Sequence, residues 1–532
     1  MGAVNSVLGF FKTGPDAPPI QNPGAVRSIY HFKRWSVFLS ILFGYSTFYV
    51  CRQVFSVTKK SMLDGGVLDA NQMGNIGAIM LITYALGKFT NGFLADRANV
   101  RRFMPTGLLL VAAMVMCFGF SHYYILFLVL WALHGWFQSM GAVVCGVSLS
   151  QWFSNRERGR YYSAWSCSHS LGEGFSIYAT ALVVTWYGWR SGYFFSAAFA
   201  AIIALILYRT LADRPTTCGL PAVADFRNDH AEVAPLNDDS VGSAQREVFR
   251  NPYVWIVCFA SLTMYVTRYG MTSWGPLYMQ ESKDYSLVAV GGLFFVAKIF
   301  ETFGTFASGF ISDLLFKSKR NVVTIVCCLF MVIGLGVFAM TPTTFVGTLD
   351  RGLLGKIEAG AVKPEILGAL AGSGLYPGGN AVVASVEKAK QPEWTVNAPT
   401  WMPDWMPNWH GCRIVDAEGT LRVYKNYRIE HLIGASIYGM GIGCLIAFLG
   451  GLIAIDICSK KASGVAMGTV GLVSYIGATM QEKISGRLIE GHKIVVGGLP
   501  SHDFTPVMTF WFCSAVLCLI LSCFLWNAKP RD

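Results

Sequence analysis

Two arginines recur in the same local pattern inside long apolar runs of the chain. The motif Tyr49-Val50-Cys51-Arg52 returns as Tyr265-Val266-Thr267-Arg268, with the two arginines 216 positions apart. Each run is long enough to cross a bilayer core as a helix, and an arginine at the centre of such a helix costs about 2.5–3.5 kcal/mol. Because this cost arises at two matched positions, we expect the two arginines to have a partner. An anion held between the two copies would be such a partner.

The chemistry of the side chain favours a phosphate or carboxylate partner. Guanidinium is a planar fork of donors that binds oxyanions in bidentate fashion and stays charged at physiological pH. Arg52 and Arg268 could therefore clamp one doubly charged group from opposite sides. The structural alternative is that each arginine pairs with a buried carboxylate, for which Glu173, Glu301 and Glu482 are available.

A second group of candidates places phenol groups beside cations. Tyr84 and Lys88 are four residues apart, so they share one face of a helix. Tyr45, Tyr49 and Arg52 likewise line one face. A phenol and a cation on one stripe suit the recognition of phosphate and hydroxyl groups. The alternative for Lys88 is that its ammonium extends toward the cytoplasmic headgroups.

Three further polar residues in apolar runs are candidates for substrate contact. His169 could hydrogen-bond a phosphate or hydroxyl group, with its protonation favoured by the anion. A single histidine is also often a core residue with satisfied hydrogen bonds. Gln138 and Tyr475 are neutral candidates for hydroxyl contacts.

The elements that position these residues are expected to be membrane-spanning helices. The chain of 532 residues is 53% hydrophobic and 14% charged, which is too apolar for a soluble protein of this size. Apolar windows of about 20 residues recur along it, and only helices or closed barrels can cross a bilayer. We expect twelve spanning helices, at residues 34–57, 72–95, 103–121, 124–150, 160–185, 190–210, 252–279, 287–312, 321–342, 430–455, 463–489 and 506–527.

The lysines and arginines predict the orientation of these helices. One set of short loops is rich in them, and by the positive-inside rule it is cytoplasmic, together with both termini. The opposite set has fewer, mainly Lys59, Lys60, Arg190, Lys283 and Lys493. The cytoplasmic loop residues Asp96, Arg97 and Asp313, with the basic residues near them, are expected to form salt bridges that break when the two halves move.

Two segments are expected to lie outside the membrane and to divide the chain. Residues 211–250 are polar and form a cytoplasmic linker between a first half (34–210, preceded by the cytoplasmic segment 1–33) and a second half (251–532). The insertion 343–429 lies on the opposite face, inside the second half. Its middle part, 352–390, is expected to form a short helix or two. Its tryptophans could lie at the lipid interface or over the mouth of the pore, or the whole insertion could have no transport role.

The duplication indicates the architecture. Gly92-Phe93-Leu94-Ala95-Asp96 matches Gly309-Phe310-Ile311-Ser312-Asp313, almost in the register of the two arginine motifs. Parallel repeats of six helices are the mark of the major facilitator fold, in which the substrate site lies near the bilayer midplane between the halves. The predicted fold class is therefore an all-α integral membrane protein with twelve helices in two pseudo-symmetric halves.

Other classes of function find little support in the sequence. The fourteen cysteines lie almost entirely within the apolar windows and show no CxxC pair, so they predict neither a disulfide framework nor a metal site. The net charge of +11 is explained by the positive-inside rule and not by nucleic acid. No nucleophile–base set, nucleotide loop or metal spacing is present, so we expect neither an enzyme nor a cofactor.

Short motifs occur along most of the chain outside the insertion 343–429. They are Gly44-Tyr45 with Arg52, Tyr84 with Lys88-Phe89, Gly92 with Asp96-Arg97, Trp136-Phe137-Gln138, Glu157-Arg158-Gly159, Ala164-Trp165 with His169, Arg268-Tyr269-Gly270, and Gly471-Leu472 with Tyr475-Ile476-Gly477. Together they resemble the organophosphate:phosphate antiporter family of the major facilitator superfamily. The junction from Asp213-Arg214-Pro215 to Ala222-Val223, followed by Asn251-Pro252-Tyr253, is most similar to the hexose 6-phosphate transporter and sensor branch.

The resemblance implies exchange of a sugar phosphate for inorganic phosphate by a rocking motion of the halves. It implies that Arg52 and Arg268 clamp the phosphate. The other residues that it places in the site are Tyr45, Tyr49, Tyr84, Lys88, Gln138, His169 and Tyr475.

The second half departs from the family pattern near Arg268. Lys298 stands where the family resembled here carries glutamate, and Glu301 follows one turn later. Glu173 replaces an expected glycine, and Gln481-Glu482-Lys483 replaces small residues. Either Lys298 forms a buried pair with Glu482 or Glu301, or it is a third phosphate-binding cation. Unpaired burial of either charge would be costly.

The first functional hypothesis is a secondary transporter that exchanges a sugar phosphate, with hexose 6-phosphate as the expected substrate, for inorganic phosphate. The alternatives are a sugar-phosphate receptor that signals to a kinase, and a proton-coupled symporter of an organic anion. The expected partners are the small-molecule substrate and membrane lipid, with no nucleic acid, and the expected state is a monomer. The motifs favour a bacterial inner membrane.

Overall fold

The computed structural model of the chain describes residues 9–95, 98–229, 246–315, 320–349, 386–388, 393–396, 412–417, 420–425, 427–458, 463–496 and 499–526. All structural statements below refer to these residues.

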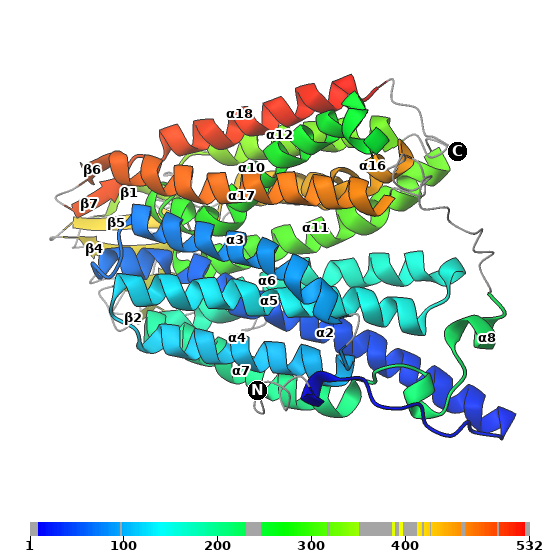
Figure 1. Ribbon diagram of the computed structural model, residues 1–532. Helices are drawn as coiled ribbons and strands as arrows, with labels where there is room; N and C mark the ends of the chain where they lie inside the picture. Colours follow the sequence, from blue (N-terminus) through cyan, green and yellow to red (C-terminus); the bar gives the residue numbers. More distant parts are fainter. Residues whose placement is uncertain are drawn as a thin grey trace.

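Twelve long helices make up most of the described structure (Figure 1). The first six are α2 (Pro23–Asp64), α3 (Ala70–Ala95), α4 (Val100–Phe120), α5 (Tyr124–Trp152), α6 (Asn155–Tyr187) and α7 (Trp189–Thr210). The other six are α10 (Pro252–Glu281), α11 (Leu287–Leu315), α12 (Arg320–Met340), α15 (Ile429–Ala447), α17 (Ser463–Gly491) and α18 (Thr505–Phe524). The π-helical turn η2 (Phe448–Leu452) and α16 (Ile453–Asp456) extend α15.

The first helix of each set begins with the same asparagine–proline pair, a repeat that the arginine motifs did not reveal. Asn22 precedes Pro23 at the start of α2, and Asn251 precedes Pro252 at the start of α10. Each asparagine side chain accepts hydrogen bonds from the first free backbone N–H groups, and proline at the first helical position has no N–H to satisfy. This cap explains why α2 begins eleven residues before the predicted span at 34.

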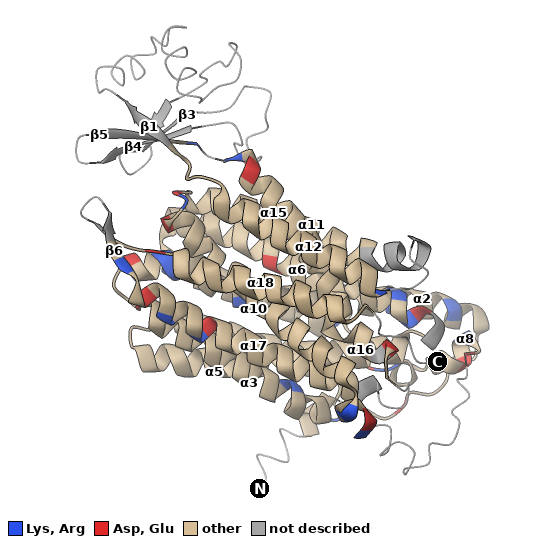
Figure 2. Cartoon of the chain, turned by 90° about the horizontal axis from the view of Figure 1, so that it is seen from above, with Lys and Arg blue, Asp and Glu red and all other residues tan. Residues whose placement is uncertain are grey.

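The two sets of helices meet along three contacts. α3 packs against α17, α6 packs against α11, and α2 packs against α10 between them. These contacts bring residues from both sets of six helices together in the middle of the molecule. Lys and Arg, Asp and Glu gather at the two ends of the helix bundle, with few along its middle (Figure 2).

Nine of the twelve long helices are apolar enough, by length and composition, to cross a membrane. The three below that threshold in the described residues are α6, α10 and α17. They carry polar groups that the bundle buries, among them Glu173, Arg268 and Glu482. The predicted fold class is confirmed, and the helices that are weakest in hydropathy are those that meet between the two sets.

The described parts of the insertion are strands. Strands β1 (Phe345–Leu349), β2 (Val386–Lys388), β3 (Glu393–Val396), β4 (Cys412–Ala417) and β5 (Thr420–Lys425) form an antiparallel sheet in the order β1-β5-β4-β3-β2. The prediction of helix is therefore wrong for 386–388, where Val386 pairs with Val396, whereas 352–385 and 389–390 lie outside the described residues. Trp394 lies in β3, and Trp401, Trp405 and Trp409 fall outside the described range.

A second small sheet caps the same end of the bundle. The hairpin β6 (Lys493–Val496) and β7 (Leu499–His502) lies beside the first sheet, at the end opposite the C-terminus (Figure 1). The sequence analysis left this region as a loop. Nearby, Lys283 is buried, and its ammonium donates to the carbonyls of Ala339 and Thr341 at the end of α12, 2.9 and 2.6 Å away. Burial and the neighbouring Arg428 lower the pKa of Lys283 below its usual range.

Glycines allow close packing between helices of the second half. A Cβ atom added at Gly334 on α12 would lie 2.5 Å from the backbone nitrogen of Tyr438 and 2.7 Å from the carbonyl oxygen of Gly434, both on α15. Small residues at such crossings let backbones approach, which drives helix association where lipid offers no hydrophobic contrast. By contrast, nothing lies within 4 Å of a Cβ added at Gly468.

We expect the change Gly334→Ala to destabilise the protein by about 1–3 kcal/mol, because the added methyl forces α12 away from α15. The midpoint of thermal unfolding of the detergent-purified protein should fall. The matched change Gly468→Ala adds the same methyl to open space and should leave the midpoint unchanged or slightly higher. Equal midpoints for the two variants would contradict the close packing.

Candidate functional site

The first six helices contribute phenol groups around Arg52. Tyr45 and Tyr49 lie one turn apart on α2, and their hydroxyl oxygens are 3.5 Å apart. The hydroxyl of Tyr84 on α3 lies 3.4 Å from that of Tyr45. The ring of His169 on α6 lies 5.9 Å from the ring of Tyr49, between centroids. The structure thus brings together four residues that the sequence analysis singled out.

Arg52 is buried among aromatic rings. Its guanidinium carbon lies 5.0 Å from the centre of the Tyr269 ring, 5.7 Å from that of Tyr49 and 5.9 Å from that of Tyr84. Among the described residues no carboxylate forms an ion pair with it, and its Nη1 has no hydrogen-bond partner. The rings offset part of the cost of burial. The guanidinium therefore keeps both its charge and a donor for a ligand.

Lys88 lies between aromatic rings of the two helix sets. Its ammonium is 5.3 Å from the centre of the Tyr84 ring on α3 and 5.3 Å from that of Tyr475 on α17. No described carboxylate forms an ion pair with it. Because Tyr475 belongs to the opposite set, the ammonium faces the contact between the sets and not the membrane surface. Arg52 and Lys88 both flank the ring of Tyr84.

Arg268 lies in a different environment, a quartet of charged residues made of Arg268, Glu173, Lys298 and Glu301. Its Nη2 is 3.5 Å from a carboxylate oxygen of Glu173 and 3.7 Å from one of Glu301. The ammonium of Lys298 is 2.5 Å from Glu173 and 2.6 Å from Glu301. All four side chains are buried. The alternative of a buried carboxylate partner thus describes Arg268, although it does not describe Arg52.

The quartet crosses between the two helix sets. Glu173 comes from α6, whereas Arg268 comes from α10 and Lys298 and Glu301 come from α11. Glu301 also accepts a hydrogen bond of 2.9 Å from Ser170 of α6. The predicted pairing of Lys298 with Glu301 is present, joined by Glu173, and the other predicted partner of Lys298, Glu482, lies elsewhere.

Several polar atoms at the quartet and beside it have no hydrogen-bond partner among the described residues. Nε and Nη2 of Arg268 and Nε2 of His169 are buried and have no hydrogen-bond partner among the described residues. The imidazole Nε2 lies 3.8 Å from a carboxylate oxygen of Glu301. Buried polar groups are normally satisfied, so several unsatisfied donors in one place point to a ligand or ordered water.

Glu482 pairs with Lys59, a residue that the sequence analysis assigned to an outer loop. The structure places Lys59 inside α2, with its side chain 0% exposed. Its ammonium donates to the hydroxyl of Ser273 at 2.7 Å and lies 3.7 Å from Glu482. Trp274 donates to Glu482 at 2.9 Å, and Lys59 lies 3.4 Å from the centre of a Trp274 ring. Lys59, predicted in a loop, is a buried contact between the sets because α2 extends to Asp64.

The surroundings of Arg268 therefore differ from the expectation at one more residue. Lys483 was expected among the unusual charges near Arg268, but it is exposed on α17, one position beyond the buried Glu482. Adjacent helix positions point about 100° apart, so only one of the two can face the centre.

The space between these groups is small in this conformation. A cavity of ≈ 30 Å³ is lined by Arg52 and Gln53 of α2, Glu173 of α6, Tyr269 of α10 and Glu482 of α17, with other residues. This volume holds little more than one water molecule. The pair Lys59 and Glu482 with Trp274 closes the site on the side of the two sheets.

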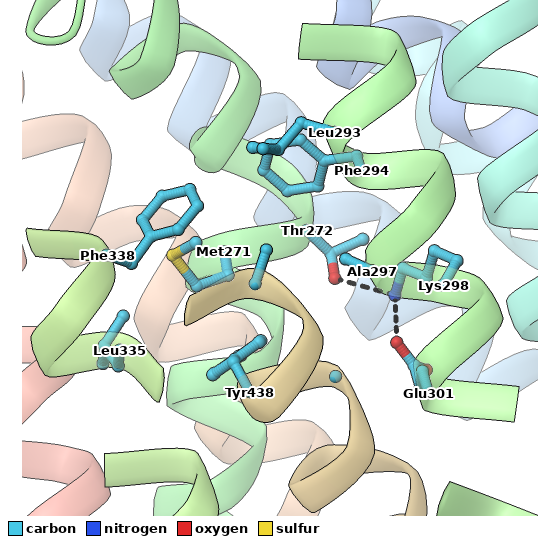
Figure 3. A pocket seen from close by; sticks show the side chains of 12 residues that line it. Met271, Thr272, Leu293, Phe294, Ala297, Lys298, Glu301, Leu335, Phe338 and Tyr438 are labelled. Atoms are coloured by element: carbon cyan, nitrogen blue, oxygen red, sulfur yellow. Dashed lines mark hydrogen bonds and ion pairs between the residues drawn. The ribbon is translucent and has the colours of Figure 1, made fainter. Parts of the chain in front are cut away.

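A second pocket borders the quartet from within the second helix set (Figure 3). It measures ≈ 20 Å³, and apolar side chains such as Met271, Leu293 and Phe338 line most of it. Lys298 and Glu301 lie at its edge, where the ammonium also lies 3.4 Å from the hydroxyl of Thr272. Lys298 and Glu301 thus have apolar groups on one side, and His169 and Arg268 on the other.

The structure gives no site contact for Gln138, and it does not describe the side chains of Asp96, Arg97 and Asp313. Gln138 is buried on α5, and neither amide atom has a hydrogen-bond partner. Asp96 and Arg97 lie outside the described residues. Asp313 lies in α11, where only the backbone is described beyond Ala307. The gating role of these acidic and basic residues stays a prediction.

Tyr269 is the main residue of the site that the sequence analysis did not assign. Its ring lies beside the guanidinium groups of both Arg52 and Arg268, 5.0 and 5.4 Å away. Tyr265 packs on Tyr475 with 5.8 Å between ring centroids. Tyr265 was part of the repeated motif, and Tyr269 follows Arg268 directly, so both signals were present in the sequence.

The charges between the helix sets leave a surplus. The described cations are Arg52, Lys88, Arg268 and Lys298, and the carboxylates are those of Glu173 and Glu301, so the net charge is +2. Lys59 and Glu482 form a separate neutral pair. The surplus is concentrated at Arg52 and Lys88, and it equals the charge of a phosphate dianion in magnitude.

Comparisons with known proteins agree with this geometry. The sequence model of the Major Facilitator Superfamily matches residues 41–388. The chain is 31% identical over 341 residues to the Membrane sensor protein UhpC of Escherichia coli (strain K12), covering 63% of this chain and 77% of the relative. It is 33% identical over 332 residues to the Probable hexose phosphate transport protein of Chlamydia muridarum, covering 59% and 73%.

Another relative matches a larger share of the chain. The Glycerol-3-phosphate transporter of Haemophilus influenzae is 26% identical over 496 residues, covering 89% of each chain. Among solved structures, a bacterial homologue of the human lysosomal transporter Spinster, in an inward-facing and unoccupied conformation, matches with a TM-score of 0.62. It is 14% identical and covers 93% of this chain and 97% of its own, so it supports the fold alone.

The matched model and relatives belong to transporters and to a membrane sensor, in agreement with the prediction that the chain is not an enzyme. The chain is an integral membrane protein of the Major Facilitator Superfamily, and within it belongs to the organophosphate:phosphate antiporter family.

Proposed function

We propose that the protein is a secondary transporter that exchanges a sugar phosphate, with hexose 6-phosphate as the expected substrate, for inorganic phosphate. One observation carries this proposal: two cations at the contact between the two helix sets, the buried Arg52 and the half-buried Lys88, have no described carboxylate partner. The names of the relatives, which include hexose phosphate and glycerol 3-phosphate transporters, support organic phosphates as the substrate class.

The phosphate binds on the side of Arg52 and Lys88, where the surplus charge lies. Arg268 reaches it from the opposite helix set with its unpaired N–H groups, so the predicted clamp is an asymmetric one. A unit charge pair 4 Å apart is worth about 4 kcal/mol at an effective dielectric constant of 20. The dianion therefore offsets a large part of the cost of burying the two cations.

Binding at this place couples to movement of the two halves, for which we take 34–210 and 251–532 as units. The ligand contacts both, so it shifts the balance between conformations open to either side of the membrane. In the described conformation, Lys59 and Glu482 hold the halves together on the side of the sheets. We propose that this side is extracytoplasmic, that both termini are cytoplasmic, and that the membrane is a bacterial inner membrane.

A sugar-phosphate receptor is the second candidate, and one structural observation favours it. At the end of the first six helices opposite the sheets, α8 (Val223–Arg227) and the start of α2 form one packed unit, in which the Phe226 ring stacks on Tyr30 with 3.9 Å between centroids. Glu157 there pairs with Arg34 at 2.6 Å and with Arg227 at 3.4 Å. Such a unit could report the state of the helices to a kinase.

Counterflow separates the two candidates. Proteoliposomes loaded with radioactive phosphate should release it when external hexose 6-phosphate is added, if the protein is an antiporter. Binding of the sugar phosphate without release, together with co-purification of a kinase, would select the receptor. Uptake of the sugar phosphate that needs no internal phosphate and collapses with a protonophore would select a proton-coupled symporter.

The change Arg52→Lys should reduce phosphate exchange in proteoliposomes at least 100-fold, and Arg268→Lys should reduce it strongly. Both keep the charge but lose the planar fork of donors that binds two phosphate oxygens. The matched control is Arg190→Lys. Arg190 lies at the start of α7, where it contacts Ser121 and His122 and neither of the two arginines tested. Undiminished exchange by a folded Arg52→Lys variant would refute the role of this arginine.

Removal of the second surplus charge should change the pH dependence of substrate affinity. A phosphate monoester gains its second negative charge near pH 6. With a site charge of +2, raising the pH from 5.5 to 7.5 should lower the half-saturating concentration of hexose 6-phosphate. In Lys88→Gln the site charge is +1, so the same rise in pH should improve affinity much less. Parallel pH profiles for the two proteins would contradict the charge count.

A further inference from the structure

We propose that the carboxylates of Glu173 and Glu301 bind hydroxyl groups of the organic part of the substrate. They would thereby select polyhydroxylated phosphate monoesters over monoesters without hydroxyl groups. The proposal rests on the proposed function, because it assigns the other end of the same substrate. It names the quartet of Arg268, Glu173, Lys298 and Glu301 as a hydroxyl-binding subsite.

The separation of charge between the two helix sets is the first argument. Arg52 and Lys88 lie among phenol rings and carry the whole surplus of +2. The quartet has two cations and two carboxylates and is neutral. A dianion is attracted to the first place, whereas at the quartet it would meet two carboxylates. A substrate with an anionic end and a neutral polar end fits both places in one orientation.

The hydrogen-bonding groups of the quartet are the second argument. Nε and Nη2 of Arg268 and Nε2 of His169 have no hydrogen-bond partner among the described residues, although Nη2 and Nε2 lie 3.5 and 3.8 Å from the carboxylates, which are strong acceptors. A hydroxyl group donates one hydrogen bond and accepts others, so it can bridge such a carboxylate and such a donor. Inorganic phosphate or a simple alkyl phosphate brings no such hydroxyl to this place.

The way in which the carboxylates are held is the third argument. The ammonium of Lys298 lies between them, 2.5 Å from Glu173 and 2.6 Å from Glu301, so it fixes their positions from one side. On the far side of Lys298 lies the apolar pocket of ≈ 20 Å³ lined by Met271, Leu293 and other apolar groups (Figure 3). This pocket holds little more than a water molecule, and apart from Lys298 and Glu301 only Thr272 and Tyr438 bring polar side chains to it, so a sugar must approach from the side of His169 and Arg268.

The subsite also involves both halves. Glu173 belongs to α6, whereas Glu301 belongs to α11, and Ser170 of α6 donates to Glu301 at 2.9 Å. Recognition of the hydroxyl groups is therefore complete only when the two halves are close together. Lys298 acts through the carboxylates that it holds, so it is a positioning residue and not a direct ligand.

The test is a competition experiment on phosphate exchange in proteoliposomes, with glucose 6-phosphate and methyl phosphate as external competitors. Both compounds carry a phosphate monoester, but only the sugar carries hydroxyl groups. In the wild-type protein, glucose 6-phosphate should compete at a lower concentration than methyl phosphate. Glu173→Gln and Glu301→Gln should each weaken competition by glucose 6-phosphate about tenfold or more, which is the usual size of a lost hydrogen bond to a charged group.

Competition by methyl phosphate should be unchanged or stronger in both variants, because each removes a negative charge near the phosphate. Opposite effects on the two competitors cannot arise from a general loss of folded protein. Glu173→Asp, which keeps the carboxylate, should recover part of the preference for the sugar. The matched control is Glu281→Gln, whose carboxylate contacts His502 and Lys60 at the end of α10; it should leave the ratio of the two competitors unchanged.

An unchanged ratio in Glu173→Gln and Glu301→Gln, or an equal loss for both competitors, would overturn the inference. A failure of the proposed function shows itself differently, as absence of phosphate exchange in the wild-type protein with either compound. In that case a measurement of binding tests the subsite without transport. Glucose 6-phosphate should raise the unfolding temperature of the purified wild-type protein more than methyl phosphate does, and the two glutamine variants should lose this difference. Equal shifts in wild type and variants would reject the subsite.

Discussion

The structure depends on the cost of placing charge in a membrane interior. Unpaired charge there is expensive, so intramembrane ionisable groups pair with one another or face a ligand site. Here Lys59 pairs with Glu482, and Lys298 and Arg268 pair with two glutamates. Arg52 and Lys88 alone among these described cations form no ion pair, and aromatic rings lie beside both. The same physical rule that explains the pairs makes the two exceptions informative.

The pairs also determine how the halves are joined. Lys59 with Glu482, and Glu173 with Lys298, each connect one set of six helices to the other. Buried ion pairs contribute little net stability because desolvation offsets their attraction, but removal of one partner is costly. They therefore act as position-specific contacts, which suits halves that must separate and meet again. The helices α6, α10 and α17, which bury Glu173, Arg268 and Glu482, are less apolar than the other long helices described.

The asymmetry between the halves follows from a few residues. The sequence repeats Tyr-Val-x-Arg in both, yet the two arginines lie in different chemistry. Around Arg52 the neighbours are phenol rings, and around Arg268 they are carboxylates contributed by α6 and α11. Glu173, one turn from His169 in the first half, reaches into the second half and neutralises its arginine. Duplication thus supplied two similar cations, and later differences gave them separate tasks.

Hydropathy, the repeated motifs and the positions of charge were enough to predict twelve helices, the major facilitator architecture and the candidates Arg52, Tyr45, Tyr49 and Tyr84, because periodicity and burial cost act locally along the chain. The antiporter family was identified from the resemblance of short motifs. The sequence could not decide which carboxylate meets which cation. Lys59 was expected in a loop, and both Glu482 and Glu301 stayed open as partners of Lys298, because pairing depends on how α2, α6, α11 and α17 pack side by side. Only the tertiary structure shows that Arg268 is compensated and Arg52 is not, since that difference arises from Glu173 and Glu301, which lie 95 and 33 positions away from Arg268 in the chain.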